Sequence, residues 1–254
     1  MRIRIGEVEL TILENGQIED LAFRGESIFP KGQLSWLIRA FRGESEVRIA
    51  KVEQEKDRLL YHWEKTEEPL VMQVTEKYTV FTVLECPDSF DFLEIGPIVT
   101  SLNEVVGDVI GVVQGGMVAI GIQALNVKTL AGFPYELKDQ VIYRKETPTS
   151  ELTVSALDFS MAAAYDMPFG SVLQLYCENR RRDRIKTVCY AENCIPAPKL
   201  ERDDADIKGC SFALFACEKE AALAVIGEIE MGEGLPHPML DGEWLKTSRK
   251  AVCS

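Results

Sequence analysis

The chain has 254 residues, of which 46% are hydrophobic and 27% charged, and its formal net charge is −13. This composition supports a folded core, whereas the excess of carboxylates speaks against binding to nucleic-acid phosphates. No apolar run approaches the roughly 20 residues that span a bilayer. We therefore expect neither a nucleic acid nor a membrane as partner. The one basic cluster, Arg180–Arg182 with Arg184 and Lys186, lies between strand-like runs and is interpreted as a solvated loop.

The seven cysteines are scattered and form no C-x-x-C motif. The first ten residues alternate in polarity instead of resembling a signal peptide. Both observations predict reduced thiols and a cytoplasmic location. Secretion would require an export signal upstream of the given sequence.

Strand-like segments follow one another through the first third of the chain. The predicted strands are Arg2–Leu13, Ile18–Phe23, Glu46–Glu53, Asp57–Trp63 and Val71–Leu84. They are rich in residues that suit a pleated, half-buried surface. Asn15-Gly16 and Glu55-Lys56 fall between neighbouring segments and are interpreted as hairpin turns.

The centre of the chain, Asp91–Phe133, is dense in valine and isoleucine and is interrupted at Gly96-Pro97 and Gly115-Gly116. Paired glycines reach the positive φ angles of a tight turn, so we predict a β-hairpin there. Further strands are predicted at Gln140–Arg144, Leu152–Phe159, Ser171–Glu178 and Ile185–Tyr190. Strands at hairpin spacing without helices between them indicate an all-β fold, a large antiparallel β-sandwich.

One helix is predicted near the end, over Glu218–Glu230, where apolar residues recur at helical spacing. Glycines and prolines after Glu230 end it. The last residues then form an extended exit segment. We therefore divide the chain into a sandwich over residues 1–216 and a helix with linker over residues 217–254.

The chain offers little for catalysis. His62 and His237 are its only histidines, and neither lies in a nucleophile motif, so no Ser-His-Asp device is predicted. Four cysteines lack the paired short spacing of zinc ligands; they are Cys189, Cys194, Cys210 and Cys217. No glycine-rich phosphate loop precedes a helix. We expect no metal and no cofactor, and no catalytic residue is identified.

A carbohydrate site is the one binding pattern that the residues suggest. Asp241 and Glu243 flank Gly242 and precede Trp244, and His237 lies just upstream. Carboxylates can hydrogen-bond sugar hydroxyls, and an aromatic ring presents an apolar face to a sugar ring. The predicted carbohydrate-binding residues are His237, Asp241, Glu243 and Trp244. The simpler interpretation is a solvated turn over a packed Trp244.

Four stretches carry a resemblance to a known family: GPIVTSL (Gly96–Leu102), VGDVIGVV (Val106–Val113), AIGIQALNVKTLAG (Ala119–Gly132) and LFACEKEAALAVIGEIEMGEGLPHPMLDGEWLKTS (Leu214–Ser248). They resemble the amino-terminal β-supersandwich, galactose-mutarotase-like in shape, of multidomain glycoside hydrolase-like enzymes that carry a following TIM barrel. The resemblance implies a non-catalytic module that supports the barrel and contributes one wall of an oligosaccharide site. No catalytic residue is carried over, because TIM-barrel enzymes hold theirs on barrel strands.

Two alternatives stay open. One is a free-standing sugar-active enzyme of the mutarotase or epimerase type, in which His62 would have to serve in the acid/base pair. The other is a structural or assembly protein that pairs through an exposed sheet face.

Overall fold

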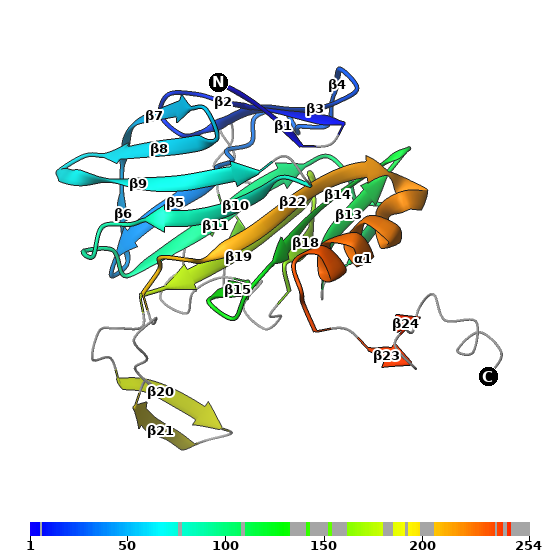
Figure 1. Ribbon diagram of the computed structural model, residues 1–254. Coiled ribbons are helices and arrows are strands. Elements are labelled where there is room, and N and C mark those ends of the chain that lie inside the picture. Colours follow the sequence, from blue (N-terminus) through cyan, green and yellow to red (C-terminus); the bar gives the residue numbers. More distant parts are fainter. Residues whose placement is uncertain are drawn as a thin grey trace.

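The computed structural model describes residues 1–5, 7–75, 78–107, 110–132, 162–179, 206–236 and 238–240, together with the strand backbones at 141–142, 152–153, 185–190, 193–198 and 243–244. Its strands form three large sheets and three two-stranded hairpins (Figure 1). Every strand pairing in these residues is antiparallel. The predicted all-β antiparallel sandwich with one helix near the C-terminus is therefore confirmed.

The three large sheets differ in size. The four-stranded sheet comprises β1 (Arg2–Ile5), β2 (Val8–Ile12), β3 (Ile18–Phe23) and β4 (Glu26–Ser27). The eight-stranded sheet has the order β12 (Val105–Gly107), β13 (Gly111–Gly115), β14 (Val118–Ala124), β22 (Ser211–Glu218), β10 (Val80–Glu85), β9 (Thr66–Thr75), β8 (Arg58–Trp63) and β7 (Ile49–Glu55). The six-stranded sheet contains β15 (Thr129–Ala131), β19 (Gly170–Glu178), β11 (Phe92–Thr100), β5 (Ile38–Arg42) and β6 (Ser45–Val47), with β18 (Ala164–Met167) also paired to β19.

Three small hairpins complete the strands. They are β16 (Val141–Ile142) with β17 (Leu152–Thr153), β20 (Ile185–Tyr190) with β21 (Asn193–Pro198), and β23 (Met239–Leu240) with β24 (Glu243–Trp244). The remaining residues of the predicted segments Gln140–Arg144 and Leu152–Phe159 lie outside the described residues, as do Arg180–Arg182 and Arg184 of the basic cluster. The backbone of Lys186, the last member of that cluster, belongs to β20.

Two predicted strands are in fact hairpins. Residues Arg2–Leu13 form β1 and β2, in which Ile3 lies opposite Leu10. Residues Val71–Leu84 divide between β9 and β10, and Tyr78 and Thr79 have positive φ angles of 45° and 43° just before β10. The sequence signal for this break is the charged pair Glu76-Lys77 within an otherwise strand-like run. Folding each run back on itself pairs backbone groups that one long strand would leave exposed.

Other turns agree with the prediction. Gly16 and Gly116 have positive φ angles of 81° and 57° at hairpin turns, and so does Lys56 at 55°. Gly96-Pro97, however, does not end a strand, because β11 runs through it with a register shift against β19 between Ile95 and Ile98. The irregularity is a bulge that bends the strand without ending it.

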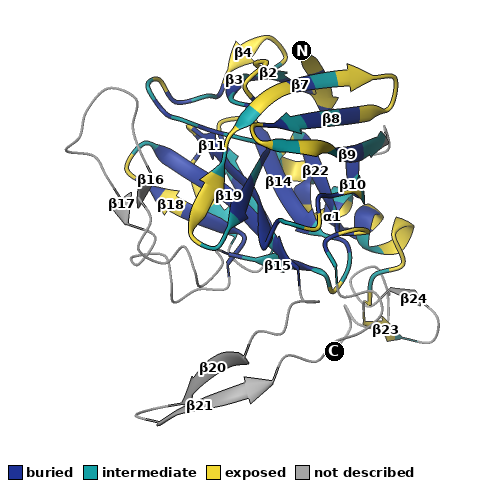
Figure 2. Cartoon of the chain, turned by 90° about the vertical axis from the view of Figure 1, so that its left-hand side faces the viewer, coloured by how far each residue is buried: buried dark blue, intermediate teal, exposed yellow. Residues whose placement is uncertain are grey.

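One hydrophobic core joins all three large sheets, with Leu10, Phe81 and Leu93 as contributors from the three in turn. Figure 2 shows buried residues concentrated where the sheets face one another. Phe81 of β10 and Phe212 of β22 stack there with ring centroids 5.0 Å apart. Burial of such large apolar side chains is the main source of stability in a sandwich of this type.

The predicted helix is present as a short 3₁₀ turn, Lys219–Ala221, followed by α1 (Ala222–Gly232). Helix α1 covers the face of the eight-stranded sheet that points away from the main core (Figure 1). Its buried residues Ile226 and Ile229 pack with Val80 and Phe215. Gly121 makes room for this layer, because a Cβ atom at that position would collide with the Phe215 ring. Among the described helices, none is long and apolar enough to cross a membrane.

Candidate functional site

The structure describes the predicted carbohydrate-binding residues only in part. His237 and Asp241 lie outside the described residues, and so do the side chains of Glu243 and Trp244. The backbone of Glu243 and Trp244 forms β24, which pairs with Leu240 and Met239 of β23. The exit segment is therefore a small hairpin at this point, and the sugar-binding role of its side chains stays a prediction.

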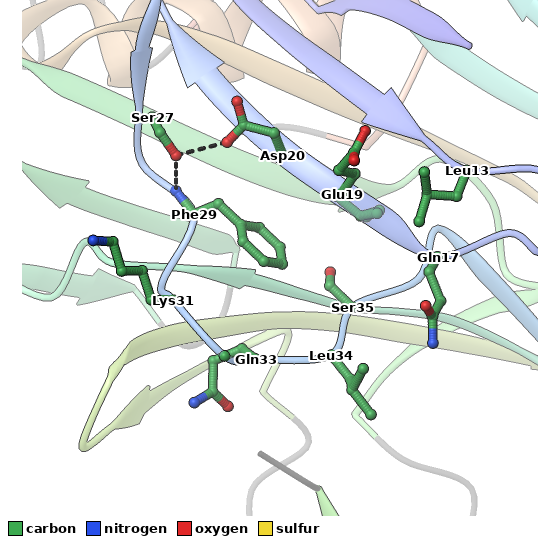
Figure 3. A pocket seen from close by; sticks show the side chains of 12 residues that line it. Leu13, Gln17, Glu19, Asp20, Ser27, Phe29, Lys31, Gln33, Leu34 and Ser35 are labelled. Atoms are coloured by element: carbon green, nitrogen blue, oxygen red, sulfur yellow. Dashed lines mark hydrogen bonds between the residues drawn. The ribbon is translucent and has the colours of Figure 1, made fainter. Parts of the chain in front are cut away.

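A pocket of about 380 Å³ lies between β3 and the segment that connects β4 to β5 (Figure 3). We call it the β3 pocket. A volume of this size is within the range of small-molecule sites. Twelve residues line it: Leu13, Gln17, Ile18, Glu19, Asp20, Ser27, Phe29, Lys31, Gly32, Gln33, Leu34 and Ser35.

The connecting segment is held against the sheets at both of its ends. At one end, the Ser27 hydroxyl donates a 2.6 Å hydrogen bond to Asp20 and accepts one from the Phe29 backbone N–H. At the other end, the fully buried Ser35 hydroxyl donates to the Pro97 carbonyl at 2.8 Å and accepts from the Val99 N–H. These contacts fix the walls of the pocket without using its remaining polar groups.

The lining of the β3 pocket combines opposite charges, amides and one aromatic ring. Glu19 and Asp20 supply carboxylates, Lys31 supplies an ammonium group, and Gln17 supplies an amide. The Phe29 ring lies inside the curve of the connecting segment, below Glu19 in the view of Figure 3. Carboxylates accept hydrogen bonds and ammonium and amide groups donate them. This set suits an uncharged ligand with several hydroxyl groups and one apolar face.

A buried ion pair lies on the six-stranded sheet, and one of its members follows the pocket residues closely in the sequence. Arg39 of β5 lies opposite Glu94 of β11, and its guanidinium donates to the Glu94 carboxylate at 2.8 Å and to Glu46 at 2.7 Å. The guanidinium carbon also lies 5.0 Å from the Trp36 ring centre and 5.1 Å from that of Phe41. Contacts with two rings and two carboxylates hold Arg39 in one orientation.

Burial decides the electrostatics of this pair. The Glu94 side chain is only 2% exposed. Burial raises the pKa of Glu94 to about 7, and the favourable charge of Arg39 offsets only part of the rise. A carboxyl group that titrates near neutral pH on a sheet face is a candidate acid or base, although structural ion pairs also shift pKa values.

The structure gives His62 a carboxylate partner. His62 Nε2 of β8 lies 3.0 Å from Glu53 Oε2 of β7, and the two side chains are 39% and 41% exposed. Lys51 contacts the same carboxylate, and the pKa of Glu53 is lowered chiefly by its hydrogen bond with Lys51. The group lies on a surface edge strand, where an ion pair of this kind adds little stability.

The described cysteines are poor nucleophiles. Cys86, Cys177 and Cys210 are free and belong to the main core. Burial raises the pKa of the Cys86 thiol, and a hydrogen bond with Cys210 together with burial raises that of Cys177. Buried thiols of this kind are inert at neutral pH. In the part of the chain that the structure describes, no three His, Cys, Asp or Glu side chains are grouped so that they could hold a metal ion.

Sequence reasoning missed both the β3 pocket and the Arg39–Glu94 pair. Strand β5 was not predicted, so Arg39 could not be placed opposite a partner strand. The available signal was the mixture of apolar and positively charged residues in segment 36–42, in which Arg39 and Phe41 are two apart and so share one face of a strand. The pairing itself depends on a partner 55 residues away.

No family model, curated protein or solved structure matches this chain. The chemistry of the candidate sites therefore rests on their own residues.

Proposed function

We propose that this chain is a non-catalytic β-sandwich module of a carbohydrate-active, glycoside hydrolase-like protein, and that the β3 pocket binds a sugar. The single observation that carries the proposal is the lining of that pocket, which combines carboxylates, amides, an ammonium group and the Phe29 ring. Sugar recognition needs hydrogen-bond acceptors and donors for hydroxyl groups and an apolar platform for the ring face.

The arrangement favours binding over catalysis. Asp20 already accepts the Ser27 hydroxyl, and Ser35 is engaged at both its donor and acceptor functions. His62 is not among the described residues that line the pocket. These side chains orient a ligand without offering an activated nucleophile and base to it. Support of a following catalytic barrel, and a contribution of the exit segment to an oligosaccharide site, belong to the same proposal and rest on the family resemblance.

Isothermal titration of the full chain with a panel of mono- and oligosaccharides tests the sugar site. Replacing Lys31 by Ala or Glu19 by Gln should weaken binding about tenfold, the effect of roughly 1.4 kcal/mol, because the first removes a charged donor and the second replaces a charged acceptor oxygen by an amide NH2 group. Lys65→Ala is the matched control, since this exposed lysine lies in the β8–β9 turn and lines no part of the pocket.

The outcome also separates the two sugar positions. If Trp244→Ala abolishes binding while Lys31→Ala leaves it unchanged, the exit segment is the site and the β3 pocket is not. If the unaltered chain gives no saturable heat with any sugar of the panel, the carbohydrate proposal fails.

A second candidate is a free-standing mutarotase or epimerase, favoured by the 3.0 Å contact between His62 and Glu53. Such a dyad could transfer a proton to and from a sugar ring oxygen or hydroxyl. A coupled anomerisation assay distinguishes it from the binding module: turnover that is lost in His62→Ala and in Glu53→Gln would support an enzyme, and no turnover by the unaltered chain would exclude this one.

A further inference from the structure

A second groove of about 620 Å³ lies between the N-terminal strand β1 and the turn of the β7–β8 hairpin. We call it the β1 groove. The described polar residues of its lining are Arg2, Arg4, Gln54, Lys56 and Asp57. Three of these side chains are cationic and one is a carboxylate, in a chain whose formal net charge is −13. The charge of the described lining is therefore opposite to that of the molecule as a whole.

The geometry of β1 presents two guanidinium groups on one side. Arg2 and Arg4 are exposed, whereas Ile3 and Ile5 between and after them are buried. Residues two apart on a strand project from the same face and are about 7 Å apart along it. A guanidinium group has a planar fork of donors that matches two oxygens of a sulfate or phosphate group.

The opposite wall adds a positive charge. Lys56 lies at the tip of the β7–β8 hairpin with a φ of 55°, and its carbonyl accepts a hydrogen bond from the Gln54 side chain. The one carboxylate among the described lining residues, Asp57, accepts a 3.1 Å hydrogen bond from Gln73. That contact holds the Asp57 carboxylate toward Gln73.

An ion pair competes for Arg2. Arg2 pairs with Glu9 at 3.2 Å, with the two side chains 72% and 50% exposed. Exposed pairs of this kind are weak and are screened by salt. An incoming oxyanion with two charges can therefore replace Glu9 as the partner of Arg2.

We propose that the β1 groove binds an oxyanion, a sulfate or phosphate group, held by Arg2 and Lys56. The proposal is independent of the sugar site, because the two sites have no described lining residue in common. The group can be a free ion or an ester on a larger molecule, and the chemistry of recognition is the same for both.

The test is an NMR titration of the full chain with sodium sulfate, sodium phosphate, glucose 6-sulfate and glucose, at constant ionic strength adjusted with sodium chloride. Both anions should shift the amide signals of residues 2–4 and 54–57 to saturation, and glucose should not shift them. Arg2→Gln and Lys56→Gln should each weaken binding about fivefold or more, because each removes a charged donor.

Lys65→Gln is the matched control, because Lys65 also occupies a hairpin turn with a positive φ, of 61°. It should leave the affinity unchanged. Tighter binding of glucose 6-sulfate than of free sulfate would assign the ester as the ligand, and the reverse order would assign the free ion. Shifts that do not saturate, or that are reduced equally by Lys65→Gln, would show an effect of ionic strength only and would overturn the proposal.

Discussion

At the scale of single residues, the Arg39–Glu94 pair is a buried contact between opposite charges. Each partner loses its hydration, and Arg39 divides its donors between Glu94 and Glu46. Its Nε atom is buried without a hydrogen-bond partner. A buried pair of this kind adds little net stability. Removing one partner is nevertheless destabilising, because it leaves the other charge unpaired in an apolar environment. The pair therefore favours one arrangement of the sheet face over others.

The raised pKa of Glu94 predicts a pH dependence of stability with a definite sign. The pKa is about 7 in the folded chain and 4.5 in an unperturbed glutamate, a difference worth roughly 3 kcal/mol. The folded state thus binds the proton more tightly than the unfolded state. This contribution is fully present below about pH 4.5 and is lost as the pH rises through 7.

Urea unfolding at several pH values checks this, with Glu94→Gln as the reference because a glutamine does not titrate. The free energy of unfolding of the unaltered chain should fall relative to the variant between pH 4.5 and pH 7.5. A difference that stays constant or grows over this range would mean that Arg39 outweighs burial.

At the scale of elements, helix α1 is a layer of the fold, because Ile226 and Ile229 close an apolar cluster on the eight-stranded sheet. The helix carries no side-chain cap at its N-terminus. Eleven residues form a marginal helix in isolation. Contact with the sheet therefore supplies most of its stability, and the sheet in turn gains a cover for Phe215.

Ile229→Ala should lower the free energy of unfolding of the whole chain by about 2–5 kcal/mol, because the side chain is fully buried. Leu223→Ala is the control from the same helix, since Leu223 is 67% exposed, and it should change stability by less than about 0.5 kcal/mol. Equal effects of the two substitutions in chemical denaturation would show that α1 does not pack as described.

At the scale of the molecule, the three large sheets bury their apolar faces in one core. Smaller apolar clusters lie on the eight-stranded and six-stranded sheets, but all three sheets contribute to the main core, so loss of one sheet exposes core residues of the others. Trp63 reports on this core, because it is 3% exposed and meets the Phe90 ring edge-on at 5.1 Å. The expected consequence is cooperative unfolding.

Far-UV circular dichroism and tryptophan fluorescence should therefore give coincident urea transitions. Leu10→Ala, which alters the small N-terminal sheet, should shift both transitions to lower urea by the same amount. Met117→Ala should shift neither, because Met117 is 69% exposed. Two separated transitions would mean that the four-stranded sheet unfolds independently of the other two.

Local sequence patterns predict some elements of this architecture. Alternation of polar and apolar residues has a period of two on a strand, so it predicts strands such as Asp57–Trp63 from neighbouring letters alone. Gly16 and Gly116 mark turns because they adopt positive φ. The apolar spacing of 222–229 likewise predicts the helix. The all-β class and the position of the helix were therefore determined by the sequence.

The candidate sites were decided by tertiary structure. The register of β5 against β11 places Arg39 opposite Glu94. The wall of the β3 pocket is held by the hydrogen bond from Ser35 to the Pro97 carbonyl in the bulge of β11. Register depends on how distant strands fit one core, and no local pattern encodes it. Side chains that are far apart in the sequence come together in one site only after the strands have packed.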